Sequence, residues 1–261
     1  MSLQDKVVLV TGGAGGLGKA IVKACLANKA KGVVIADINE QLSKETETEL
    51  ANDSESGRIA TFTLDVSNES SCSAAVEFAV SHFARLDVLI NNAGVVDGFH
   101  SAATCEKDEW DRVMGINLTG PYLMTKFAVQ HFLNRGEGTD TGGSIVNIGS
   151  AASQRGAVAG VAYTTSKHSL VGLTKNTAAA HAKQGIRTNI VLPGGMLTNI
   201  ANSMPKNLDM EKLAVVQQIN ALQPGLVEVD ELAKTVVHLA SDESRAINGA
   251  VVNGDNGWNA F

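Results

Sequence analysis

A tyrosine and a lysine, Tyr163 and Lys167, are the first candidates for chemistry in this chain of 261 residues. Residues four positions apart share one face of an α-helix, so a helix here would hold the phenol beside the ammonium group. A free tyrosine has a pKa of about 10 and is a poor base at neutral pH, but a nearby cation favours the phenolate and lowers that pKa. The pair therefore suits proton transfer, although the same spacing also occurs by chance on helix surfaces.

A serine precedes this pair at the end of an apolar segment. Ile145, Val146 and Ile148 are typical of a buried strand. Such a strand would deliver Ser150 at its carboxyl end, opposite Tyr163. Its hydroxyl group could hydrogen-bond the substrate oxygen on which the tyrosine acts and fix the direction of that oxygen.

A glycine-rich segment near the amino terminus predicts a cofactor for this chemistry. The apolar run 6–10 is typical of a strand, Thr11–Gly18 supplies the glycines, and a helical pattern then begins with Ile21 and Val22. Glycines let the backbone approach a phosphate closely, and the unpaired N–H groups of a helix start bind its negative charge. A strand, a glycine turn and a helix in this order predict a dinucleotide site.

An aspartate, Asp37, follows the next predicted strand, 33–36, about 20 residues after the glycine segment. A carboxylate there can accept hydrogen bonds from the adenosine ribose and would repel the 2′-phosphate of NADP. Neither Gly13 nor Ile38 supplies the basic residue that NADP would favour. The alternative is that Asp37 caps the helix that follows; both roles are compatible with NAD as the cofactor.

Six segments together resemble the short-chain dehydrogenase/reductase family, in the family's order and over essentially the whole chain. They are Thr11-Gly12-x-x-x-Gly16-x-Gly18, Asn91-Asn92-Ala93-Gly94, Asn117, Ser150, Tyr163-x-x-x-Lys167 and Pro193-Gly194. Met196 stands where the family usually has Val or Ile, and Asn256 replaces a glycine near the carboxyl terminus.

The resemblance implies a catalytic set and a cofactor-binding set. The catalytic set is Asn117, Ser150, Tyr163 and Lys167. The cofactor-binding set is Gly12, Gly15, Gly16, Leu17, Gly18, Asp37, Ile38, Asp65, Val66, Asn92, Ala93, Gly94, Tyr163, Lys167, Pro193, Gly194, Met196 and Thr198.

Three of these roles have structural alternatives. Asn117 is expected to hold a relay water, or else to repair helix bonds that Pro121 breaks within a long helix, 106–133. Asp65 is expected near the adenine, or else as the cap of the next turn. The asparagines at 91 and 92 are expected near the cofactor, or else as ties between strands.

Alternating strand and helix patterns predict one domain, 1–261, built on a doubly wound, parallel, seven-stranded sheet of the Rossmann type. The candidate residues follow strands, which places them at the carboxyl edge where such sheets bind ligands. Residues 197–216 have weak periodicity and are expected to form a substrate lid. Trp258 and Phe261, at the end of the chain, are expected at a subunit interface, and the resemblance implies a homotetramer or homodimer.

Composition excludes several other functions. The net charge of −6 has no basic block, so nucleic-acid binding is not expected. No apolar run approaches the ~20 residues of a membrane span, and the histidines have no metal-ligand spacing. Three scattered cysteines predict free thiols and a cytoplasmic location.

The sequence therefore predicts an NAD-dependent oxidoreductase that acts on a secondary alcohol or ketone, a small-molecule substrate. Alternatives are an NADP-linked carbonyl or 3-oxoacyl reductase of the same family and a non-catalytic, NAD(H)-sensing protein. An epimerase or dehydratase of the longer related family would carry a different glycine spacing and an added carboxyl-terminal domain.

Overall fold

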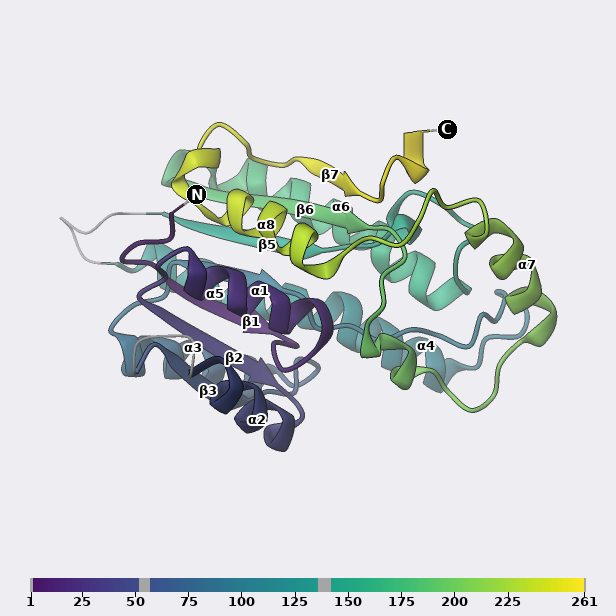
Figure 1. Cartoon of the computed structure of the whole chain (residues 1–261), viewed down its shortest axis with the longest axis horizontal. Helices are drawn as coiled ribbons and strands as arrows, with labels where there is room; N and C mark the ends of the chain where they lie inside the picture. Colours follow the sequence, from purple (N-terminus) through teal and green to yellow (C-terminus); the bar gives the residue numbers. More distant parts are fainter. Residues whose placement is uncertain (1, 52–56, 136–141, 261) are drawn as a thin grey trace.

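Seven parallel strands form the centre of the protein in a computed structural model that describes residues 2–51, 57–135 and 142–260. Their order across the sheet is β3-β2-β1-β4-β5-β6-β7 (Figure 1). Their bounds are β1 Val7–Thr11, β2 Gly32–Asp37, β3 Ile59–Thr63, β4 Val88–Asn91, β5 Gly143–Ile148, β6 Ile186–Pro193 and β7 Val251–Gly254. The predicted doubly wound parallel sheet is confirmed.

Helices cover both faces of the sheet (Figure 1). Their bounds are α1 Gly16–Ala27, α2 Glu40–Ala51, α3 Glu69–Phe83, α4 Lys107–Met114, α5 Gly120–Leu133, α6 Val161–His181, α7 Met210–Asn220 and α8 Val229–Ala240. Alternate strand residues face opposite layers: Val8 and Val10 of β1 pack with α1 and α8, whereas Val7 and Leu9 pack with α3 and α5. All five residues of β1 are buried, as expected for a strand covered on both faces.

Strand order reverses between β1 and β4, which lie side by side although three helices and two strands separate them in the sequence. Successive connections from β1 and from β4 run toward opposite edges of the sheet. A crevice therefore opens at their carboxyl ends, which is where open α/β sheets bind ligands. Thr11 ends β1 and Asn91 ends β4, so the glycine segment and the Asn-Asn-Ala-Gly segment flank this crevice.

The long helix predicted over 106–133 is divided into α4 and α5 by a π-helical turn, Gly115–Thr119. Pro121 lies in the first turn of α5, where the missing proline N–H breaks no hydrogen bond that a regular helix start would make. The predicted distortion is present, but it is a wide turn before the proline rather than a kink at it.

The predicted lid, 197–216, is more regular than its weak periodicity indicated. It contains a 3-10 turn, Asn199–Ser203, and the first part of α7, which continues beyond the predicted limit to Asn220. Figure 1 shows α7 near α4 at one end of the molecule, away from the amino terminus.

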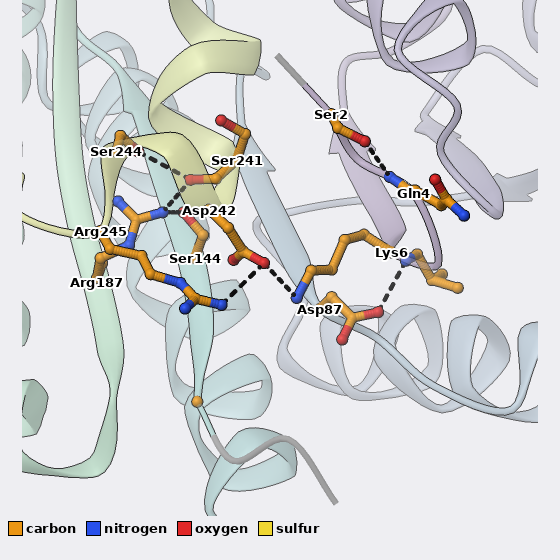
Figure 2. A network of polar contacts seen from close by, with 12 residues as sticks. Ser2, Gln4, Lys6, Asp87, Ser144, Arg187, Ser241, Asp242, Ser244 and Arg245 are labelled. Atoms are coloured by element: carbon orange, nitrogen blue, oxygen red, sulfur yellow. Dashed lines mark hydrogen bonds and ion pairs between the residues drawn. The ribbon is translucent and has the colours of Figure 1, made fainter.

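A polar network joins distant parts of the chain at the opposite, amino edge of the sheet (Figure 2). Asp242, just after α8, forms ion pairs with Lys6 and Arg245, with N···O distances of 3.4 Å and 3.2 Å. Arg187 of β6 donates to the carbonyl groups of Leu239 and Ser241, each at 3.0 Å. These contacts attach the end of α8 to the starts of β1 and β6.

Within the part of the chain that the structure describes, no helix is both long and apolar enough to cross a membrane.

Candidate active site

One cavity of about 760 Å³ runs along the carboxyl edge of the sheet and collects most of the residues predicted from the sequence. The predicted residues that line it are Gly12, Gly15, Leu17, Asp37, Ile38, Asp65, Val66, Asn92, Ala93, Gly94, Ser150, Tyr163, Lys167, Pro193, Gly194, Met196 and Thr198. The predicted residues Gly16, Gly18 and Asn117 are not among the residues that line it.

The glycine segment packs so closely against neighbouring backbone that side chains would not fit at Gly12 and Gly18. A Cβ atom on Gly18 would lie 2.0 Å from the carbonyl oxygen of Gly12, and Gly12 itself has a φ of +61°. Gly15 caps α1 without a side-chain hydrogen bond, and the first turn of α1 has no acidic residue. The N–H groups at this helix start are therefore available to an anion, and the segment fits the phosphates of a dinucleotide.

Asn92 holds this segment in place. Its amide nitrogen donates to the carbonyl groups of Thr11 at 3.0 Å and Gly12 at 2.9 Å. Asn91, its neighbour, is buried and donates to Asn147 at 2.9 Å and to Thr125 at 3.3 Å. The alternative that these asparagines tie strands and loops together is confirmed for both side chains.

Asp37 ends β2 and faces the same cavity. One carboxylate oxygen accepts from the N–H of Ala14 at 3.1 Å, and the other accepts from the N–H of Asn39 at 3.0 Å. The side chain that caps α2 is that of Asn39, which accepts from the N–H of Leu42. The alternative that Asp37 is the helix cap is therefore wrong, and its remaining lone pairs face the cavity side of the glycine segment.

Ser150 follows β5, as predicted, and its side chain has two contacts. Its oxygen accepts from the N–H of Ala152 at 3.1 Å, which caps the 3-10 turn Ala151–Ser153. The Ser150 hydroxyl also lies close enough to that of Tyr163 to favour the phenolate, which acts to lower the tyrosine pKa. The serine and the tyrosine thus present two hydroxyl groups to the same point of the cavity.

Tyr163 and Lys167 lie one helical turn apart on α6, and both are buried. The ammonium group of Lys167 donates to the carbonyl of Ile148 at 2.9 Å and stands 5.6 Å from the centre of the Tyr163 ring. Burial lowers the pKa of Lys167 to about 8.

The lowered tyrosine pKa expected from this pair is not found in the protein alone. Burial raises the pKa of Tyr163 to about 12, the nearby Ser150 hydroxyl opposes that rise, and the charge of Asp97 adds to it. The expectation fails because burial disfavours the charged phenolate more strongly than the neighbouring groups favour it. The free protein therefore holds Tyr163 as a neutral phenol.

Asn117 lies in the π-helical turn and is completely buried. Its amide accepts from the N–H of Val95 and donates to the carbonyl of Val95, each at 2.8 Å, and it also donates to Ser166 at 3.3 Å. The alternative that it repairs broken helix bonds is wrong, because these bonds go to the loop after β4. The relay water stays a prediction.

Two other predicted cofactor residues have local hydrogen bonds. Asp65 accepts from the N–H of Ser67 at 2.9 Å, as expected for the cap of the next turn. Thr198 accepts from the N–H of Ile200 at 3.5 Å. Neither contact blocks the cavity, which both residues line.

Sequence reasoning missed two residues of the cavity wall, Asp97 and Trp258. Asp97 is 1% exposed and follows the Asn-Asn-Ala-Gly segment closely, which is the signal that could have found it. Trp258 is 2% exposed, with the guanidinium of Arg155 4.9 Å from its ring centre, so the predicted interface role for this tryptophan is wrong. Phe261, the other residue of that prediction, lies outside the described residues.

Comparison with known proteins agrees with this geometry. Residues 6–209 match the family model described as short chain dehydrogenase. The 3beta-hydroxysteroid dehydrogenase 2 of Eggerthella lenta is 36% identical over 99% of this chain and 96% of its own.

Two solved structures have the same fold over nearly their whole length. The crystal structure of levodione reductase has a TM-score of 0.88 and 30% identity, and covers 99% of this chain and 100% of its own. The 3-ketoacyl-(acyl-carrier-protein) reductase from Brucella melitensis, solved in complex with NADH, has a TM-score of 0.86 and 29% identity, and covers 98% and 99%.

The chain belongs to the short-chain dehydrogenase/reductase family and is an oxidoreductase. This family uses a nicotinamide cofactor.

Proposed function

We propose that this protein is an NAD-dependent dehydrogenase or reductase that interconverts an uncharged secondary alcohol and the matching ketone. The observation that carries the proposal is that Ser150, Tyr163 and Lys167, with Lys167 one turn from Tyr163 on α6, line the same cavity as the uncapped start of α1.

Each residue has a role in that reaction. A bound nicotinamide would supply hydride transfer to or from the substrate carbon, and the resemblance implies transfer at its B face. During reduction the neutral Tyr163 phenol donates its proton to the alkoxide oxygen, and during oxidation Tyr163 acts as the phenolate, which takes the hydroxyl proton after its own proton has passed to solvent. Ser150 orients that oxygen, Lys167 holds the nicotinamide ribose and supplies positive charge near the phenol, and Asn117 orders the relay water.

Electrostatics at the adenosine end favour NAD over NADP. Asp37 presents a carboxylate beside the glycine segment, and its neighbour Ile38 is 70% exposed and uncharged. Among the described residues that line the cavity, the only ammonium or guanidinium group is that of Lys167, at the catalytic end. A 2′-phosphate would therefore meet a negative charge and no cation.

The catalytic end of the cavity favours a largely apolar, uncharged substrate. Tyr163 packs in a cluster with Val95, Val96, Val158 and Ala159. Phe99, Ile200 and Trp258 also line the cavity. A carboxylate or phosphate on the substrate would be desolvated there with no cation beyond Lys167, which the proposed reaction already uses, and such burial is costly. A relative named for 3beta-hydroxysteroids supports an alicyclic alcohol of this polarity.

A second candidate is a 3-oxoacyl reductase, because the structure named as a 3-ketoacyl reductase shares the fold over nearly the whole chain. Its thioester substrate is also uncharged near the reacting carbon. Comparison of a 3-oxoacyl thioester with alicyclic ketones at equal concentration separates the two.

The test is a panel of secondary alcohols and ketones with NAD and with NADP, followed by nicotinamide absorbance. Tyr163→Phe is expected to lose turnover by at least ~100-fold, in the range of general acid–base catalysis, while its affinity for NADH stays close to that of the unaltered protein. The chain's other tyrosine, Tyr122, is half exposed and gives a matched control, because Tyr122→Phe is expected to keep full turnover. Turnover retained by Tyr163→Phe, or a preference for NADP, would refute the proposal.

We also propose a homodimer or homotetramer in the cytoplasm. Gly172, Ala179 and Ala180 give α6 a small, exposed surface on which a second helix could pack closely. The three cysteines are free thiols, in agreement with a reducing compartment. Sedimentation at micromolar concentration tests the assembly, and a monomer there would contradict it.

A further inference from the structure

A buried carboxylate stands directly beneath the start of the catalytic helix. Asp97 is 1% exposed and belongs to the loop after β4. One of its oxygens accepts from the N–H of Gly160 at 3.0 Å, and the other accepts from the N–H of Tyr163 at 2.8 Å. Gly160 is the residue that caps α6, and that cap has no side chain of its own to offer. Asp97, from a distant part of the chain, therefore accepts the hydrogen bonds of the first N–H groups of α6, a role that a side chain at the capping position normally has.

The loop that carries this carboxylate is itself fixed. Glu109 of α4 accepts from the N–H of Gly98 and bonds His100 at 2.7 Å. Arg112, one turn further along α4, donates to the carbonyl of Val96 at 2.8 Å. Asp97 also accepts from the N–H of Phe99 at 3.2 Å within its own loop. The carboxylate is thus a rigid support rather than a mobile side chain.

The lid is bonded to the same loop. The N–H of Val96 donates to the hydroxyl of Ser203 at 3.0 Å, and the N–H of Asp209 donates to the carbonyl of Gly98 at 2.9 Å. The segment around Asp97 therefore lies between the lid and the tyrosine.

The charge of Asp97 also acts on the phenol. Burial raises the pKa of Asp97, the three backbone N–H groups oppose that rise, and Glu109 adds to it. The negative charge of Asp97 in turn raises the pKa of Tyr163. The other charged or titratable groups around this point are Lys167 on α6, Glu109 and Arg112 on α4, and His100 and Cys105 in the loop.

We propose that Asp97 is a positioning residue for the reaction, because its carboxylate fixes the backbone of Tyr163 and so the reach of the phenol hydroxyl toward the substrate oxygen. The inference rests on the proposed function, since it requires that Tyr163 transfers the proton.

The first experiment compares Asp97→Asn with Asp87→Asn. Asp87 is a matched control because it is a 3% exposed carboxylate at the other end of β4, where it accepts from the N–H of Val7 at 2.8 Å and from Arg85 at 2.6 Å. Asp97→Asn replaces one accepting oxygen by an NH2 group that faces a backbone N–H. A displacement of about 1 Å at the reacting group costs on the order of 100-fold in rate, so kcat is expected to fall 10- to 100-fold with NADH affinity unchanged. Asp87→Asn is expected to lower Tm but to leave kcat within about twofold.

The second experiment measures the ionisation of Tyr163 directly. The chain has two tyrosines, so in a Tyr122→Phe background the ultraviolet absorbance of the phenolate reports Tyr163 alone. Removal of the Asp97 charge is expected to move this titration, and the rise of the oxidation rate with pH, to lower pH. Asp87→Asn in the same background is expected to move neither.

Gly160→Ala tests the same contact without removing the charge. Its Cβ would lie 2.6 Å from a carboxylate oxygen of Asp97, so the carboxylate must shift. This variant is expected to lose kcat while the phenolate titration stays near that of the unaltered protein, and it serves if Asp97→Asn fails to fold. An unchanged kcat in the variants, or an unmoved titration in Asp97→Asn, would overturn the inference. Absence of turnover in the unaltered protein would instead refute the proposed function.

Discussion

The cost of keeping Lys167 charged inside the protein gives a stability prediction that runs against intuition. Burial lowers its pKa from 10.5 to about 8. At about 1.4 kcal/mol per pKa unit, the charged form costs the folded protein roughly 3 kcal/mol below pH 8. Lys167→Met, which keeps the length of the side chain without the charge, is expected to remove that cost.

Part of the gain is lost again. The ammonium group donates to the carbonyl of Ile148 at 2.9 Å, and the loss of a hydrogen bond to a charged group costs about 1.5–3 kcal/mol. We therefore expect Lys167→Met to be more stable than the unaltered protein by about 1 kcal/mol at pH 7 without cofactor, and to be inactive.

The sign of the pH dependence follows from the lowered pKa. Between the folded pKa near 8 and the usual value of 10.5, the unfolded chain binds more protons at this group than the folded chain. The contribution of Lys167 to stability therefore rises with pH in that window. The difference between Lys167→Met and the unaltered protein should fall by up to about 1.4 kcal/mol from pH 8 to pH 9 and change little below pH 7.

Urea unfolding at pH 6, 7, 8 and 9 measures the free energy of unfolding of both proteins. In the difference between the two values, the titration of groups common to both proteins cancels. Lys175, exposed on the same helix, supplies the control, and Lys175→Met is expected to show no pH-dependent difference. A Lys167→Met protein that is less stable at every pH, or a difference that does not change between pH 8 and 9, would refute the reasoning.

Two further predictions concern the cofactor. Gly18→Ala places a Cβ 2.0 Å from the carbonyl oxygen of Gly12, so the glycine segment must move. Overpacking of this kind costs about 1–3 kcal/mol, and NADH affinity measured by fluorescence titration should therefore fall by about 10-fold. Gly172→Ala, whose Cβ would meet nothing within 4 Å, should bind NADH normally, and equal affinities in the two variants would contradict this account. Asp37→Asn keeps an acceptor for the N–H of Ala14 but removes the negative charge. Because two like charges a few ångströms apart repel by more than 1 kcal/mol, kcat/KM for NADP relative to NAD should rise by about tenfold. An unchanged ratio would show that Asp37 does not face the 2′ position.

The fold was predictable because its signals are local. Strands such as β1 are short apolar runs, and the burial of every residue of β1 explains why that run does not alternate with polar residues. Asp37, Ser150 and Pro193 were placed at one edge by topology alone, since each follows a parallel strand.

Other features depend on contacts between distant segments, which a single sequence does not contain. Nothing near Asn117 indicates that its amide bonds the backbone of Val95. Tyr163 has the expected spacing to Lys167, but the shift of its pKa comes from burial, from Ser150 and from Asp97. Helix α7 was missed because its polar and apolar residues show no strong period and only Val216 is buried.

The position of Trp258 in the cavity wall decides which end of the chain can carry a tag or fusion partner. Arg155, close to Ser150 in the sequence, bonds both Trp258 and Asn259, so the last described turn of the chain is attached to the wall of the candidate active-site cavity. An affinity tag fused after residue 261 would be separated by three residues from Trp258, which lines that cavity. The amino terminus lies at the far edge of the sheet, near the network of Lys6 and Asp242 (Figure 2). Tags, surface attachment and fusion partners therefore belong at the amino terminus, and kinetic constants measured on carboxyl-terminal fusions would describe an altered pocket.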